Sequence, residues 1–267
     1  MIVWQDSWYE PHDGFRMLHI YLPDWYYDSS ERLPVMYFFD GHNLFTDTHA
    51  TYGRSWRFSQ FLSRWEKPMI VVGLECSHEG DERLSEYNPY DRRWGQRTVH
   101  GIGEKTVQWV EKEVKPAIDH RFRTWPHREA TGIAGSDLGG LLALYAVCCH
   151  NQTFGKAAAI SGGLRFCERH LLRDLKTSRV SLDSRVYISW GEHEAGRLYI
   201  DQDHFDPYYD SAEARATHLV ADELESRGAT TMVHYQKGGR HQESDWERQT
   251  PTFMEFLWLD RRTSQRI

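Results

Sequence analysis

The chain has 267 residues, 27% charged residues and a formal net charge of −7, values typical of a soluble globular protein with room for one large α/β core. Acidic and basic residues are mixed along the chain, so there is no basic stripe and we expect no nucleic-acid partner. No stretch approaches the roughly 18 apolar residues of a transmembrane helix, so we expect no membrane partner. Because no linker or internal repeat is visible, we predict a single domain over residues 1–267.

The N-terminus and the cysteines indicate where the protein works. Residues 1–6 have no basic segment followed by an apolar core, so we expect no signal peptide. The four cysteines, Cys76, Cys148, Cys149 and Cys167, form no CxxC pair. This pattern is typical of a reducing compartment, so we expect a cytoplasmic protein. The sequence leaves open whether the protein forms a homo-oligomer.

The first half of the chain begins with strands. Residues 15–22 alternate apolar and polar side chains, which predicts an outer strand. Residues 35–39 and 69–74 are continuous apolar runs, as expected for strands covered on both faces of a parallel sheet. Apolar residues then recur at helical spacing over 107–118, and residues 130–135 predict another short strand.

Strands and helices continue to alternate in the second half. Helices are predicted over 138–149, 212–225 and 246–259, and strands over 156–160, 186–190 and 230–235. This alternation predicts an α/β fold with a mostly parallel central sheet and helices on both faces. Sites in such folds form at the carboxyl ends of the strands.

The sharpest motif is GSDLGG at residues 135–140, between a predicted strand and a predicted helix. That is the setting of the nucleophile elbow, G-x-S-x-G, whose glycines leave room for a tight, strained turn. The middle residue here is Asp137 where the pattern expects serine, and Ser136 lies one residue too early to replace it. The N–H groups of the following helix would favour an anion at Asp137.

Residues 101–163 around this motif resemble the esterase family of α/β-hydrolases that includes esterase D, feruloyl esterases and enterobactin-type esterases. Three further segments resemble motifs of that family in the same order: FDGHNLF at 39–45, RLSEYNP at 83–89 and GGRHQESDW at 238–246. The similarity covers roughly residues 15 to 260. It implies an α/β-hydrolase fold and a hydrolase of carboxylic-ester or acyl-sugar-like substrates.

The resemblance also assigns roles. His241 would be the general base, and an acid after the strand at 186–190 would orient it. We favour Glu194 as that acid, with Glu192, Asp201 and Asp203 as alternatives. We expect Asp137, His241 and this acid to meet at the carboxyl ends of the strands, in the chain order expected for the fold.

The remaining site residues are predicted from position. The oxyanion hole would use the backbone N–H of Leu138 and a second N–H from the loop that contains His42 and Asn43. Aromatic rings from segments between strands would line the substrate pocket, and we expect these to be Trp56, Tyr87 and Trp94.

Asp137 changes what the site can do. A carboxylate needs no base and can attack an sp³ carbon, as in haloalkane dehalogenases and epoxide hydrolases. Attack on an acyl carbon would form an anhydride and expel a poor leaving group, so ester hydrolysis by Asp137 should be slow. Dehalogenases place a tryptophan beside the aspartate, where this chain has Leu138.

Three interpretations follow. The protein is a working hydrolase with Asp137 as nucleophile or as base for water, a binding protein that keeps the pocket without efficient turnover, or a family enzyme whose serine was replaced on purpose.

The segment containing His193, Asp201, Asp203, His204 and Asp206 offers hard ligands for a metal ion. The spacing matches no known site, so an acidic loop is the simpler interpretation. We therefore predict no metal and no cofactor, and a small-molecule substrate as the partner.

Overall fold

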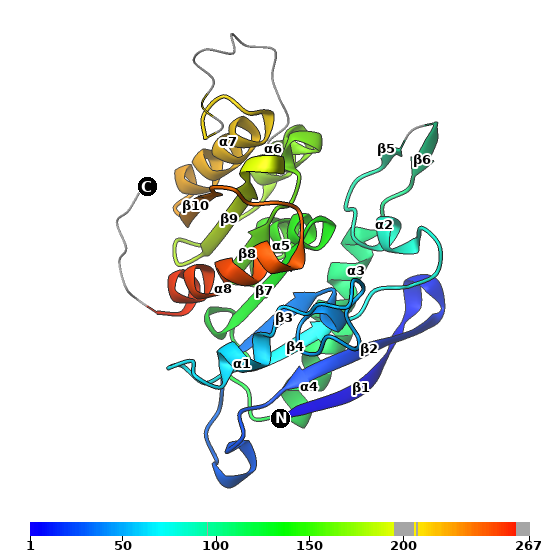
Figure 1. The fold of residues 1–267 in the computed structure, drawn as a ribbon, viewed down its shortest axis with the longest axis vertical. Helices are drawn as coiled ribbons and strands as arrows, with labels where there is room; N and C mark the ends of the chain where they lie inside the picture. Colours follow the sequence, from blue (N-terminus) through cyan, green and yellow to red (C-terminus); the bar gives the residue numbers. More distant parts are fainter. Residues whose placement is uncertain (95, 195–205, 207, 260–267) are drawn as a thin grey trace.

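The computed structural model describes residues 1–94, 96–194, 206 and 208–259. Its centre is an eight-stranded sheet in the order β1-β2-β4-β3-β7-β8-β9-β10 (Figure 1). The strands are β1 (Ile2–Tyr9), β2 (Gly14–Tyr21), β3 (Val35–Phe39), β4 (Ile70–Leu74), β7 (Thr131–Ser136), β8 (Lys156–Ile160), β9 (Arg185–Gly191) and β10 (Thr230–Gln236). A separate hairpin consists of β5 (Arg92–Trp94) and β6 (Arg97–Val99).

The sheet is mostly parallel, as predicted. β1 and β2 form an antiparallel hairpin, and β2 pairs antiparallel with β4. Every other pairing in this sheet is parallel. The carboxyl ends of β3, β4, β7, β8, β9 and β10 therefore lie along one edge, and the loops that leave this edge carry the residues of the candidate site.

Helices cover both faces of the sheet (Figure 1). Val35, Tyr37 and Phe39 of β3 pack into one core with the helices α3, α4, α5, α6 and α7. Met36 and Phe38 point to the opposite face and pack with α1 and α8. Since successive side chains of one strand enter two different cores, the strand must be apolar throughout, which is the physical reason for the continuous apolar runs.

The helices are α1 (Phe58–Leu62), α2 (Glu82–Glu86), α3 (Gly103–Trp109), α4 (Lys115–Arg121), α5 (Leu138–Cys149), α6 (Glu168–Thr177), α7 (Ala212–Ser226) and α8 (Glu243–Trp258). A π-helical segment, Val110–Val114, joins α3 to α4, so the helical spacing over 107–118 was interpreted correctly. α8 begins three residues earlier than predicted. No helix of the described ranges is long and apolar enough to cross a membrane.

Candidate active site

Asp137 occupies the turn between β7 and α5. Its backbone has φ 54° and ψ −128°, a strained combination for a residue with a side chain. The turn needs glycine around it, because a Cβ on Gly135 would lie 2.5 Å from the backbone of Gly139. The Asp137 N–H donates to the carbonyl of Ile160 at 3.0 Å, and the Asp137 carbonyl accepts from the Leu141 N–H at 3.0 Å. These contacts hold the carboxylate at the open edge of the sheet.

His241 lies beside this carboxylate, in the loop between β10 and α8. Its Nε2 is 3.4 Å from Oδ1 of Asp137, and its Nδ1 is 3.4 Å from Oε1 of Glu194. Glu194 ends the turn that follows β9, and its Oε2 accepts the Gly191 N–H at 3.1 Å. The expected meeting of the three side chains is therefore confirmed.

The alternative acids have other positions. Glu192 accepts the backbone N–H of Gly238 at 2.7 Å, and the His193 N–H donates to the carbonyl of Gly239 at 3.0 Å. Glu192 thus supports the backbone of the loop that carries His241. Asp201 and Asp203 lie outside the described residues, as do most residues of the acidic segment considered for a metal.

Arg83, which had no predicted role beyond beginning the RLSEYNP segment, contacts the opposite side of Asp137. Its Nη1 lies 3.2 Å from Oδ2 of Asp137. Its Nε and Nη2 donate to the two carboxylate oxygens of Asp40, each at 2.8 Å. Asp40 directly follows β3 and is 5% exposed, so it fixes the guanidinium in a bidentate pair. Asp137 consequently lies between two cations.

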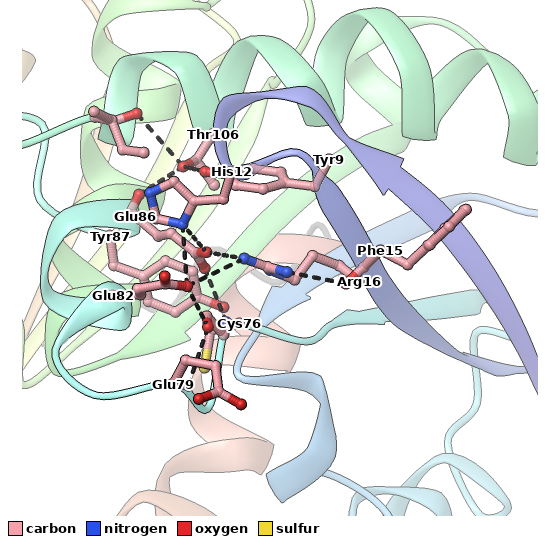
Figure 2. Close-up of polar contacts among 12 residues, drawn as sticks. Tyr9, His12, Phe15, Arg16, Cys76, Glu79, Glu82, Glu86, Tyr87 and Thr106 are labelled. Atoms are coloured by element: carbon pink, nitrogen blue, oxygen red, sulfur yellow. Dashed lines mark hydrogen bonds and ion pairs between the residues drawn. The ribbon is translucent and has the colours of Figure 1, made fainter.

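A buried polar cluster fixes α2, the helix that carries Arg83, against the β1–β2 hairpin (Figure 2). Glu86 is 1% exposed. It accepts a hydrogen bond from the guanidinium of Arg16, lies 3.1 Å from Nδ1 of His12, and accepts the Ser77 N–H at 3.0 Å. A buried carboxylate without partners would destabilise the fold, so these contacts hold α2 against the hairpin. The orientation of Arg83 follows from that position.

The charges of the site stabilise one another. Burial alone would raise the pKa of Asp137, but the hydrogen bond to His241 and the charge of Arg83 lower it to about 2. Burial alone would lower the pKa of His241, but its bonds to Asp137 and Glu194 raise it to about 9. Burial would likewise raise the pKa of Glu194, and the bond to His241 and the Gly191 N–H lower it. At neutral pH, His241 is therefore an imidazolium between two carboxylates.

Asp137 and His241 are accessible to solvent, whereas Glu194 is mostly buried. The side chain of Asp137 is 38% exposed and that of His241 is 47% exposed, whereas that of Glu194 is 9% exposed. A small molecule can therefore touch Asp137 and His241, while the acid stays behind them. A small cavity beside the elbow is lined by Leu84, Asn88, Arg92, Val99 and Leu138.

A family model described as "Putative esterase" matches residues 14–257. The chain belongs to this family. It is 24% identical over 265 residues to "Uncharacterized protein YbbA" of Bacillus subtilis (strain 168), which covers 94% of this chain and 96% of that protein.

Solved structures show the same fold. An IroE-like serine hydrolase from Shewanella oneidensis matches with a TM-score of 0.71 and 20% identity, and the match covers 96% of this chain and 79% of the hydrolase chain. The BES protein from Bacillus cereus has a TM-score of 0.69 at 17% identity, covering 96% and 94%. Enterochelin esterase from Shigella flexneri has a TM-score of 0.68 at 18% identity, covering 97% and 58%. The fold is thus that of the α/β-hydrolases, in a chain of the esterase type.

In this member of the esterase family, the predicted oxyanion donors lie directly after Asp137 and in the 3-10 turn after β3. The Leu138 N–H is at the start of α5 and contributes to lowering the pKa of the Asp137 carboxyl, and Leu138 stays a prediction as an oxyanion donor. The N–H of Asn43 donates to the carbonyl of Asp40 at 2.9 Å and closes a 3-10 turn. This N–H is therefore engaged within the turn, and Asn43 stays a prediction as an oxyanion donor. His42 stays a prediction.

The predicted aromatic lining is corrected. Trp56 and Tyr87 are each 2% exposed. Trp56 packs against the rings of Phe38 and Trp246, and the Tyr87 hydroxyl accepts the Asp40 N–H at 3.1 Å. Both rings fold back onto the sheet because burial of large aromatic surface outweighs exposing it to a ligand. Trp94 lies in β5, and its side chain is outside what the structure describes.

Proposed function

We propose that this protein binds a small carboxylic-ester or acyl-sugar-like ligand in an esterase-type site, and that Asp137 keeps its turnover of such esters slow. The observation that carries the proposal is the position of the Asp137 carboxylate between His241, at 3.4 Å, and Arg83, at 3.2 Å. Membership of the esterase family and the accessible elbow support an ester-type ligand.

Two features of the site oppose ester hydrolysis: the protonation of His241 and the chemistry of a carboxylate nucleophile. In a serine esterase, a neutral histidine removes the proton of the serine hydroxyl, which then attacks the carbonyl carbon. Here the pKa of His241 is about 9, so at neutral pH the imidazole already holds the proton that it would have to accept. Attack by the Asp137 carboxylate on an acyl carbon would form an anhydride and expel an alkoxide, which is unfavourable.

The groups that could stabilise the transition state already interact with Asp137. Arg83 and the Leu138 N–H act on the carboxylate of Asp137 itself. Such donors accelerate acyl transfer only when they interact with the oxyanion that develops during the reaction. A permanent anion beside them stabilises the resting state, and a second negative charge there would be repelled. A neutral serine would leave both donors for the oxyanion.

A working hydrolase with Asp137 as nucleophile toward an sp³ carbon is the second candidate. The strained elbow and the alignment of His241 with Glu194 favour it. Asp137 would displace a leaving group to form an ester, and water activated by His241 would cleave that ester. In that ester Asp137 carries no charge, so His241 loses one of the two carboxylates that raise its pKa. The second step would therefore accelerate as the pH rises through a value below 9.

The test is hydrolysis of p-nitrophenyl acetate by the parent protein, Asp137→Ser, and Asp137→Ser combined with His241→Ala. We expect Asp137→Ser to raise kcat/KM by about 100-fold or more, since a positioned base contributes roughly that factor. The double variant should lose the gain. A correctly folded Asp137→Ser protein with no gain would refute the proposal, and so would a fast parent that His241→Ala inactivates.

A further inference from the structure

A second cluster of reactive side chains lies behind the loop after β3. It consists of His42, Cys76 and His78, each of which offers one ligand atom within 4.8 Å of the others. The sheet brings them together, because a Cβ on Gly41 would lie 2.3 Å from the backbone of Gly73 in β4. This close approach places His42 next to the segment that follows β4.

His42 provides the observation that points to a ligand. It is 4% exposed, and its Nδ1 has no hydrogen-bond partner among the described residues. Its other nitrogen, Nε2, is 2.9 Å from the hydroxyl oxygen of Thr51. A buried ring nitrogen without a partner is unfavourable, and the bond to Thr51 fixes the ring so that Nδ1 is the atom left for a ligand.

His78 is exposed, but one of its ring nitrogens is likewise paired. Its Nε2 pairs with Oε1 of Glu75 at 2.6 Å, which leaves its Nδ1 for a ligand. The rings of His42 and His78 are 4.7 Å apart, centroid to centroid. A carboxylate or hydroxyl on the far nitrogen is the usual partner of a metal-bound histidine, because it fixes the tautomer and orients the ring.

We propose that His42, Cys76 and His78 bind one Zn²⁺ ion. Two imidazole nitrogens and a sulfur form a donor set that suits zinc and is unsuited to Mg²⁺ or Ca²⁺, which prefer oxygen. Tetrahedral zinc would place these donor atoms about 3.4–3.6 Å apart. The ligand atoms now lie within 4.8 Å of one another, so they would have to move closer when zinc binds. Three protein ligands leave one position for water.

The thiol must lose a proton for this site to form. Cys76 is 3% exposed. Its thiol donates a hydrogen bond to Oδ1 of Asp40, with the sulfur 3.5 Å from that oxygen. As the donor in this contact, the thiol carries its proton. Zinc binding breaks the S–H bond, forms a Zn–S bond and releases one proton to solvent.

The proposal does not depend on the function assigned to Asp137. Its test is calorimetric titration of the full, chelator-treated chain with ZnCl₂, in two buffers of different ionisation enthalpy. We expect one Zn²⁺ per chain and one proton released. Cys76→Ser and His78→Ala should each weaken binding by about 100-fold or more, since removing even an outer partner of a metal ligand costs about 10–100-fold.

Matched controls use residues of the same type elsewhere. Cys167→Ser changes another buried cysteine, and His100→Ala changes another exposed histidine that pairs with a carboxylate. Both should bind zinc as the parent does. With Co²⁺ as a probe, the parent and Cys167→Ser should show a sulfur-to-cobalt charge-transfer band that Cys76→Ser lacks.

Failure of the parent to bind Zn²⁺ would overturn the proposal. A charge-transfer band that survives in Cys76→Ser would also overturn it. Zinc binding that is lost only in His241→Ala would overturn it too, because the ion would then bind at the candidate active site. Circular dichroism of each variant separates loss of the site from loss of the fold.

Discussion

The two cations that contact Asp137 are held in different ways. Arg83 forms a bidentate pair with the buried Asp40, with both distances at 2.8 Å, and its helix is fixed by the buried Glu86. His241 is 47% exposed and has 3.4 Å contacts on both sides. The first cation is permanent and rigidly placed, whereas the second is titratable and more loosely held.

This difference indicates how the charge of the site can change. A guanidinium keeps its proton at any pH at which the protein is folded, so Arg83 keeps its positive charge beside Asp137. His241 can lose its proton, and its environment sets the pH at which this happens. We call Arg83 with Asp40 the Arg83 side of the site, and His241 with Glu194 the His241 side. The Arg83 side therefore determines the structure of the site, and the His241 side determines its protonation state.

The largest expected effect comes from breaking the Arg83 side. Asp40→Ala should lower the free energy of unfolding by about 3 kcal/mol, because it leaves a mostly buried guanidinium with Asp137 alone. Urea denaturation at neutral pH measures this. Asp40→Asn keeps the shape and one acceptor, so its loss should be smaller. Equal stability of the parent and Asp40→Ala would show that Arg83 does not need its buried partner.

The corresponding change on the His241 side should cost less. Glu194→Gln should lower the free energy of unfolding by about 1 kcal/mol or less, because the half-exposed His241 is screened by solvent and keeps Asp137 as a partner. The same urea experiment provides the number. A loss as large as that of Asp40→Ala would contradict the distinction between the two sides.

The smallest effect is on the pH dependence of stability. The folded-state pKa of His241 is raised from its ordinary value of 6.5 to about 9. Its contribution to stability is thus fully present below pH 6.5 and is lost as the pH rises through about 9. The unfolding free energies of the parent and His241→Gln should therefore differ by up to about 1 kcal/mol near pH 6, and less near pH 10. A difference that grows with pH would contradict the raised pKa.

The fold and the His241 side could be predicted from the sequence because their signals are local. The continuous apolar runs mark strands buried on both faces, and GSDLGG marks a turn that only glycines permit. His241 and Glu194 each follow a strand, so their meeting follows from the parallel sheet alone.

The Arg83 side could not be predicted in the same way. Arg83 lies in a short helix whose orientation depends on buried contacts with Arg16 and His12, about 70 residues earlier in the chain. β1 also went unpredicted, because it is an edge strand whose side chains are mostly half-exposed or exposed. Trp56 and Tyr87 were misplaced because an aromatic side chain has the same sequence signal in a core as in a pocket.

The central claim is that the Asp137 carboxylate holds His241 as an imidazolium at neutral pH. The most direct test is an NMR titration of the His241 ring in the parent and in Asp137→Asn, which keeps the shape of the side chain without its charge. The account predicts a pKa of about 9 in the parent and a value lower by about one unit or more in Asp137→Asn. A parent pKa near the ordinary 6.5, or a raised value that Asp137→Asn leaves unchanged, would contradict it.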